Sequence, residues 1–196
     1  MGQRSQIYVR VDNELIIANY YGWNYAERMI SRARYGIECL KYYVDNGYTW
    51  CFKSGSQEVE KIRRMFDVNF DCKDIVMSTD ILREWTEYGS GDFSDFVFNQ
   101  DNNDGMLFIW IDTENKTIKY CFSDCDSKNP LDCDNYMIFD TECCYEDYKF
   151  PAGLIKSKQM TTYNRNKKYI EKNAQLMTAA ELKDFKNIHK LSVKTA

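Results

Sequence analysis

Hydrophobic side chains alternate with more polar ones between residues 6 and 11 (QIYVRV), which is the period of a half-buried β-strand. Residues 12–14 (DNE) have the composition of a turn, and residues 15–18 (LIIA) would form the returning strand. The chain is therefore expected to begin with a β-hairpin.

A helical period replaces this alternation after the hairpin. Asn24 is expected to cap a long amphipathic helix, with Glu27 completing a capping box, and Asn46-Gly47 is expected to end it. The core-facing side of this helix would carry Ala26, Ile30, Ala33, Ile37, Leu40 and Val44. A second stripe on the other side carries Arg28, Arg32, Tyr35, Cys39 and Tyr42.

The next segment predicts short elements. Residues 48–52 (YTWCF) alternate as a strand would, and Ser56 is expected to cap a short helix that extends to Phe66. A further helix is expected near Ile81, Leu82 and Trp85.

A central antiparallel β-meander follows, with strands expected at residues 96–98, 106–111 and 118–122 and a short fourth strand at residues 136–139. Thr178 and Glu181 have the spacing of a capping box at the start of a C-terminal helix.

These elements predict a single α+β domain over residues 1–196. A length of 196 residues with 44% hydrophobic side chains suits one domain, and it excludes a disordered chain. No run of apolar residues is long enough to cross a membrane, and the amino terminus lacks the apolar core of a signal peptide. A cytoplasmic protein without a membrane partner is expected.

The scarcity of histidine excludes several catalytic arrangements. His189 is the single histidine, so the sequence contains neither an HExxH zinc motif nor a pair of histidines for a transition metal. No glycine-rich phosphate loop is present either. We therefore expect a protein that is not an enzyme, with no catalytic residue, no bound metal and no cofactor.

Three weaker patterns have a possible metal chemistry. Cys121, Cys125, Cys133, Cys143 and Cys144 could hold zinc, but their irregular spacing favours structural cysteines. Asp124-Cys125-Asp126 and Asp132-Cys133-Asp134 could chelate a hard cation, although an acidic loop produces the same pattern.

A metal-dependent nuclease is the third pattern. Asp104 with Glu114-Asn115-Lys116 imitates the acidic residue and ExK motif of such enzymes. The motif falls in an expected hairpin turn, where these residue types are common, so turn chemistry is the favoured interpretation.

Charge is distributed unevenly along the chain. The formal net charge of −4 divides into −1 over residues 1–89, −10 over residues 90–150 (the acidic meander region) and +7 over residues 151–196 (the basic helical tail). A rigid acidic surface can occupy a channel that is lined with lysine and arginine for nucleic acid. The residues expected to bind such a partner are Asp92, Asp95, Asp101, Asp104, Asp124, Asp126, Asp132, Asp134, Glu142, Glu146 and Asp147.

An aromatic and basic patch offers an alternative. Trp23, Tyr25, Arg28 and Arg32 combine stacking surfaces with guanidinium groups, as in a nucleotide or nucleic-acid-binding module, and the basic tail could assist them. Packing between the hairpin and the long helix would explain the same residues equally well.

The stretches MGQRSQIYVR and NYYGWNYAERMISRARYGIE resemble the opening of small accessory proteins that phages and mobile elements encode, in particular anti-CRISPR proteins of the type II kind. The resemblance covers about the first 40 residues and carries over no functional residue or fold. It implies a small non-enzymatic inhibitor that is made in the cytoplasm of a bacterial host cell and binds a host CRISPR effector nuclease. The acidic region would then compete with DNA or guide RNA.

Overall fold

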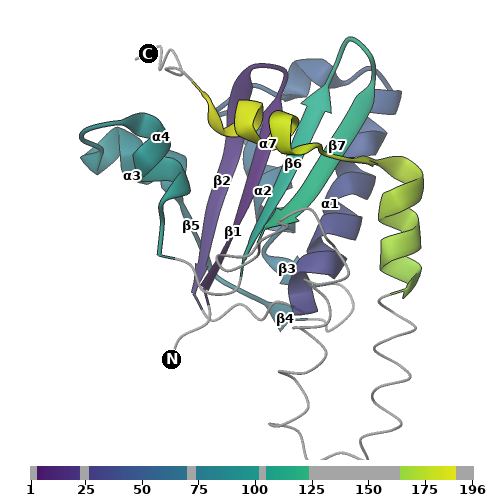
Figure 1. Ribbon diagram of the computed structural model, residues 1–196, viewed down its shortest axis with the longest axis horizontal. Helices are drawn as coiled ribbons and strands as arrows, with labels where there is room; N and C mark the ends of the chain where they lie inside the picture. Colours follow the sequence, from purple (N-terminus) through teal and green to yellow (C-terminus); the bar gives the residue numbers. More distant parts are fainter. Residues whose placement is uncertain (1–3, 23–26, 70–73, 102–104, 124–163, 189–196) are drawn as a thin grey trace, which may run out of the picture.

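The fold is built on a six-stranded mixed sheet with helices on both faces (Figure 1). The computed structural model describes residues 4–22, 27–69, 74–101, 105–123 and 164–188. The strand order is β5-β2-β1-β6-β7-β8, and β3 (Val68–Asn69) pairs with β4 (Asp74–Ile75) in a separate small sheet.

The main sheet contains two antiparallel hairpins, and the strands that pair between the hairpins run parallel to each other. β1 (Arg4–Val11) pairs antiparallel with β2 (Glu14–Gly22), and β6 (Met106–Asp112) pairs antiparallel with β7 (Thr117–Ser123). Between the hairpins, β1 and β6 run parallel, with Ile7 opposite Leu107. The short strands β5 (Ser78–Asp80) and β8 (Gln175–Leu176) lie at the two edges of the sheet.

The sheet separates two hydrophobic cores, and this explains why its central strands are buried on both faces. Ile7 and Val9 of β1 lie in the first core, under α1 (Glu27–Asp45) and α2 (Gln57–Met65). Tyr8 between them lies in the second core, which also contains residues from α3 (Ile81–Tyr88), α4 (Phe93–Phe98) and α7 (Ala179–Lys186). Figure 1 shows α7 crossing one face of the sheet while α1 lies behind the other.

The N-terminal hairpin, the long amphipathic helix, the β6–β7 hairpin and the C-terminal helix confirm the expected α+β class. The hairpin turns at Asp12, whose φ is 50°, and α1 is followed by Gly47, whose φ is 71°. Thr178 accepts a hydrogen bond from the Glu181 amide, which confirms the capping box of α7. The expected cap at Asn24 and the strand at residues 136–139 lie outside the described residues.

Two expected strands are wrong. Residues 96–98 belong to helix α4, because the Asp92 side chain caps it and because Phe93 and Val97, one turn apart, both face the second core. Residues 49–51 form a 3₁₀ turn rather than a strand, with Cys51 buried and Trp50 63% exposed. Within the described residues, no helix is long and apolar enough to cross a membrane.

Candidate functional site

A cleft of about 700 Å³ opens between α2 and α3, beside the β2–β5 edge of the sheet. We call it the α2–α3 cleft. Its lining combines apolar residues with charged residues of both signs, and consists of Ile16, Ser54, Gly55, Ser56, Gln57, Val59, Glu60, Lys61, Arg63, Arg64, Asp80, Leu82, Arg83, Thr86 and Glu87.

Local capping positions both walls of the cleft. The Ser56 hydroxyl accepts a hydrogen bond from the Val59 amide at 3.2 Å and donates one to the Cys51 carbonyl at 3.1 Å, which fixes the start of α2. On the opposite wall, the Asp80 carboxylate accepts from the amides of Leu82 and Arg83 at 3.0 and 3.2 Å. β5 then brings this cap to the sheet, because Asp80 pairs with Asn19 of β2.

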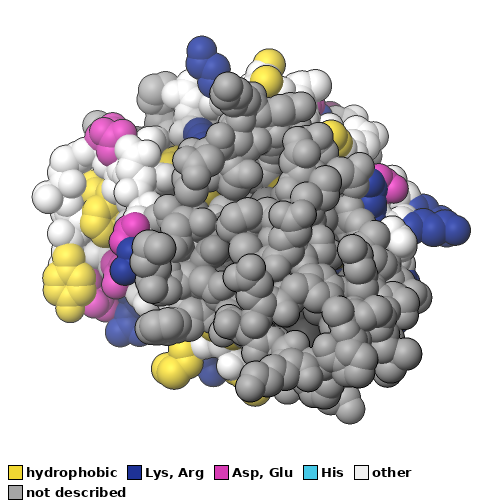
Figure 2. Space-filling view, turned by 60° about the horizontal axis from the view of Figure 1, so that its bottom comes forward, with side chains coloured by type: hydrophobic (Ala, Val, Ile, Leu, Met, Phe, Trp, Pro, Cys, Tyr) yellow, Lys and Arg dark blue, Asp and Glu magenta, His cyan; other side chains and the backbone are white. Residues whose placement is uncertain are grey.

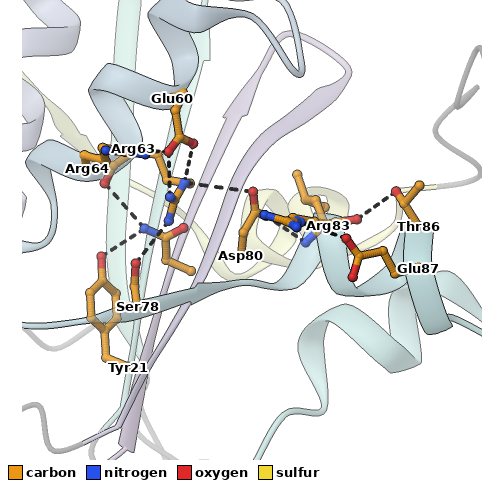
Figure 3. Close-up of polar contacts among 11 residues, drawn as sticks. Tyr21, Glu60, Arg63, Arg64, Ser78, Asp80, Arg83, Thr86 and Glu87 are labelled. Atoms are coloured by element: carbon orange, nitrogen blue, oxygen red, sulfur yellow. Dashed lines mark hydrogen bonds and ion pairs between the residues drawn. The ribbon is translucent and has the colours of Figure 1, made fainter. Parts of the chain in front are cut away.

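Ion pairs organise the charges of the cleft (Figure 3). Glu60 accepts two hydrogen bonds of 2.8 Å from Arg63 and one of 2.7 Å from Arg64. On α3, the Arg83 Nε donates to Glu87 at 2.8 Å. Arg63 also reaches across to α3, with its Nε 3.9 Å from the Asp80 carboxylate.

These contacts shift the acid–base behaviour of the carboxylates. The hydrogen bonds from Arg63, supported by those from Arg64, lower the pKa of Glu60 to about 2. The hydrogen bond from Arg83 likewise lowers the pKa of Glu87. Both carboxylates therefore stay ionised at neutral pH and act as acceptors for the arginines.

A buried polar cluster lies behind the cleft. Asn19 donates to the Tyr21 hydroxyl at 3.1 Å and Arg63 donates to the Ser78 hydroxyl at 3.1 Å, as Figure 3 shows in part. Burial raises the pKa of Asp67, which faces Ser78, Arg63 and Tyr21. The Oδ1 atoms of Asn19 and Asp67 are buried without a hydrogen-bond partner among the described residues. This cluster connects α2 to the sheet.

The described carboxylates of the expected acidic surface form hydrogen bonds or ion pairs within the protein. Asp92 caps α4 by accepting from the Asp95 amide at 3.0 Å, and Asp95 accepts from Asn99 at 3.2 Å. Asp101 forms an ion pair with Arg4. The other expected members lie outside the described residues, namely Asp104, Asp124, Asp126, Asp132, Asp134, Glu142, Glu146 and Asp147.

The expected aromatic and basic patch differs from the structure at Arg32, which is buried. Arg32 is only 1% exposed, and its Nε donates to the Phe66 carbonyl at 2.7 Å while the guanidinium lies over the Tyr21 ring. It therefore holds α1 against the end of α2 instead of forming part of a surface patch. Trp23, Tyr25 and the side chain of Arg28 lie outside the described residues.

The residues of the possible metal sites lie only partly within the described part of the chain. Cys121 is buried on β7, where burial raises the pKa of its thiol to about 12, and the remaining four cysteines of that pattern lie outside the described residues. Glu114-Asn115-Lys116 lies in the β6–β7 turn, as expected, with Asn115 bonded to Asp112. In the described part of the chain, no group of three or more histidine, cysteine or acidic side chains could hold a metal ion.

The cleft residues are absent from the sequence-based candidates. Their signal in the sequence is the close spacing of Glu60, Arg63 and Arg64 and of Arg83 with Glu87, which also suits ordinary exposed helices. What brings the two helices together is the pairing of β5 with β2, a contact between segments about 60 residues apart.

The comparisons with known proteins add no relative to this picture. No family model matches the chain, and no curated protein or solved structure matches it.

Proposed function

We propose that the protein acts by binding a phosphate-bearing ligand in the α2–α3 cleft. The observation that supports this proposal is that four cationic side chains from two helices line one cleft, namely Lys61, Arg63, Arg64 and Arg83. Three carboxylates line it as well, so its balance is cationic in a chain whose net charge is −4.

The carboxylates of the cleft already have hydrogen-bond partners, so the cleft favours an anion over a cation as ligand. Each carboxylate is already engaged, either by an arginine or by the amides at the start of α3. Lys61 is exposed and has no carboxylate partner in the described part of the chain. Guanidinium and ammonium groups are the side chains that proteins use to hold phosphate oxygens.

Binding of inorganic pyrophosphate, measured by isothermal titration calorimetry at low and moderate salt, tests this proposal. Arg64→Gln and Arg83→Gln should each weaken binding roughly tenfold, the effect of losing one charge-assisted hydrogen bond. Lys172→Gln removes an exposed charge from the helix over residues 164–173 and serves as the matched control. Equal losses in all three variants would show a general charge effect, and the cleft would not be the site.

A second candidate function is the non-enzymatic inhibition of a host CRISPR effector nuclease. The net charge of −10 over residues 90–150, within a chain of −4, favours it, because such a segment could compete with DNA or guide RNA for a basic channel. Most carboxylates of this segment lie outside the described residues, so this proposal rests on the sequence.

Neutralisation of matched carboxylates tests the second candidate in a binding assay with a type II effector nuclease. Changing Asp124, Asp126 and Asp132 to Asn should slow association and flatten its salt dependence. The control changes three carboxylates elsewhere in the chain to their amides, Glu38, Asp45 and Glu171. No binding by the unaltered protein, or the same loss in both sets, would contradict the proposed inhibition.

A further inference from the structure

Two arginines line the α2–α3 cleft from opposite walls, and each is held in the same way by a glutamate of its own helix. Arg64 donates its Nε hydrogen to Glu60 at 2.7 Å, and Arg83 donates its Nε hydrogen to Glu87 at 2.8 Å. Both pairs span one helical turn. Because the glutamates take the Nε positions, the terminal amino groups of both guanidinium groups remain for a ligand.

The remaining amino groups are accessible. The side chains of Arg64 and Arg83 are 71% and 76% exposed. Arg63, the arginine between the two helices, is 14% exposed, donates to Glu60 and Ser78, and lies 3.9 Å from Asp80. Figure 3 shows Arg63 between Glu60 and Asp80, with Arg83 on the far side of Asp80. Arg63 thus connects the walls, and the two exposed arginines face the ligand space on either side of it.

The third cation suits a ligand with more than one phosphate. Lys61 precedes Arg64 by three residues on α2, so both lie on the same side of that helix. Apart from Arg63, which connects the walls, α2 therefore contributes two cations to the cleft and α3 contributes one. A diphosphate carries more charge and is longer than a monophosphate, so it can contact both walls at once.

The base of the cleft is apolar and suits the remainder of such a ligand. Ile16 of β2 and Val59 of α2 line it and are 3% and 4% exposed, and the half-buried Leu82 of α3 completes this surface. A volume of about 700 Å³ lies within the range of small-molecule sites. Apolar residues below and cations at the rim match a base and sugar joined to a charged diphosphate. Figure 2 shows hydrophobic, basic and acidic side chains close together at its left side, where α3 and α4 lie.

We infer that the α2–α3 cleft binds a nucleoside diphosphate, with Arg64 and Arg83 holding the diphosphate from opposite walls. Glu60 and Glu87 are positioning residues that orient the two guanidinium groups. This inference rests on the proposed binding of a phosphate-bearing ligand and specifies its class.

Calorimetric titration of the full chain with adenosine diphosphate, adenosine monophosphate and inorganic pyrophosphate tests the inference. Adenosine diphosphate should bind most tightly, roughly tenfold or more above the monophosphate, because only the diphosphate contacts both walls. Arg64→Lys and Arg83→Lys keep the charge but lose the planar fork, so each should reduce this ratio. Lys168→Gln, an exposed charge on the helix over residues 164–173, should leave the ratio unchanged.

The positioning role needs a readout other than affinity. Glu87→Gln removes a negative charge from the cleft, and this change alone would strengthen the binding of every anion. If Glu87 orients Arg83, the dissociation constant of the monophosphate divided by that of the diphosphate should fall several-fold in Glu87→Gln, whereas Glu171→Gln should retain this ratio. An unchanged ratio would exclude the positioning role.

The outcomes separate the two proposals. Equal binding of the monophosphate and the diphosphate would overturn the inference and leave the cleft as a phosphate site. Tighter binding of a single-stranded oligothymidylate than of adenosine diphosphate would overturn it in favour of a nucleic-acid strand. Absence of binding for all these probes, pyrophosphate included, would overturn the proposed function as well.

Discussion

At the scale of single residues, Gly36 of helix α1 leaves no room for a side chain beside the ring of Phe66. A β-carbon added there would lie 2.2 Å from Cε1 and 2.6 Å from Cζ of Phe66, whose side chain is 1% exposed. The same Phe66 accepts the hydrogen bond of Arg32 through its carbonyl. The close packing of α1 against the end of α2 therefore depends on the lack of a β-carbon at Gly36 and on the buried guanidinium of Arg32.

Gly36→Ala is expected to lower the free energy of unfolding by about 1–3 kcal/mol, because the buried ring cannot move away without cost. The better helix propensity of alanine offsets less than about 1 kcal/mol of this loss. Urea denaturation of Gly36→Ala in the native chain and in a Phe66→Leu background measures the effect. A loss of the same size in both backgrounds would contradict a clash with Phe66.

The carboxylates show why residue type alone is an uncertain guide to a binding surface. Asp92, Asp95 and Asp80 each accept hydrogen bonds that begin or end a helix, and Glu60 orients two arginines. A sequence shows their charge but not these engagements. The buried Arg32 shows the same uncertainty for a positive charge. A guanidinium among aromatic residues suits a surface patch and a packed junction equally well.

At the scale of elements, α7 is held by charge at its first turn. Glu181 accepts a hydrogen bond of 2.6 Å from Lys119 of β7, and its carboxylate also accepts from the Thr178 amide at 2.7 Å. These bonds, that of Lys119 first, lower the pKa of Glu181 to about 2. Lys119 thereby joins the start of the C-terminal helix to the sheet.

The stability of the protein should depend on pH through Glu181. The pKa in the folded state lies below the unfolded value of roughly 4.3, so its contribution is complete above that pH and is lost as the pH falls towards about 2. Glu181→Gln should lower the free energy of unfolding by about 1 kcal/mol at pH 7, the typical value of a helix cap at a partly exposed site. The difference from the unaltered protein should vanish near pH 2.

Thermal unfolding of both proteins across this pH range measures the effect. Glu171→Gln is the control, because its carboxylate lies 3.8 Å from Lys167 on an exposed part of the helix over residues 164–173. A constant difference between Glu181→Gln and the unaltered protein from neutral to acidic pH would contradict the linkage to Glu181.

Elements with local signals could be predicted from the sequence, and those set by distant contacts could not. The hairpin turn at Asp12, the end of α1 at Gly47 and the Thr178 capping box depend on residues within one turn of each other. In contrast, the parallel pairing of β1 with β6 joins segments about 100 residues apart. The aromatic and β-branched side chains of residues 96–98 favour a strand, but the cap at Asp92 and the shared core face of Phe93 and Val97 make the segment a helix.

At the scale of the whole molecule, the second core joins both ends of the chain. Arg10 of β1 is 6% exposed and donates to the Asp184 carbonyl of α7 at 2.8 Å, across 174 residues of sequence. It also donates to the Asp12 carbonyl at 2.8 Å, and its guanidinium lies 4.6 Å from the centre of the Trp110 ring. Lys119 approaches the same ring at 5.4 Å, so cations flank Trp110 across β1, β6 and β7.

The same dependence on distant contacts decides how much of the candidate site is visible in the sequence. The helix with Glu60 and Arg64 could be placed from its cap at Ser56, and the pair of Arg83 with Glu87 follows from helical spacing. Their convergence on one cleft requires the strand β5 to add to β2. No period or motif in the chain encodes that pairing, so the sequence predicts the acidic segment as the binding surface and not this cleft.

Arg10 provides a test of this long-range organisation. Arg10→Met keeps an unbranched apolar stem but removes the guanidinium, so the Asp12 and Asp184 carbonyls each lose one charged donor and keep, among the described residues, only the Trp110 indole and the Asn187 amide, respectively. The free energy of unfolding should fall by about 1.5–3 kcal/mol, the range for the loss of hydrogen bonds from a charged group. Amide hydrogen exchange should accelerate both in α7 and at the β1–β2 turn, because one side chain secures both. Faster exchange at only one of these places would show that the two ends of the chain are stabilised independently, and Arg34→Met, a change on α1 away from this core, should leave both unaffected.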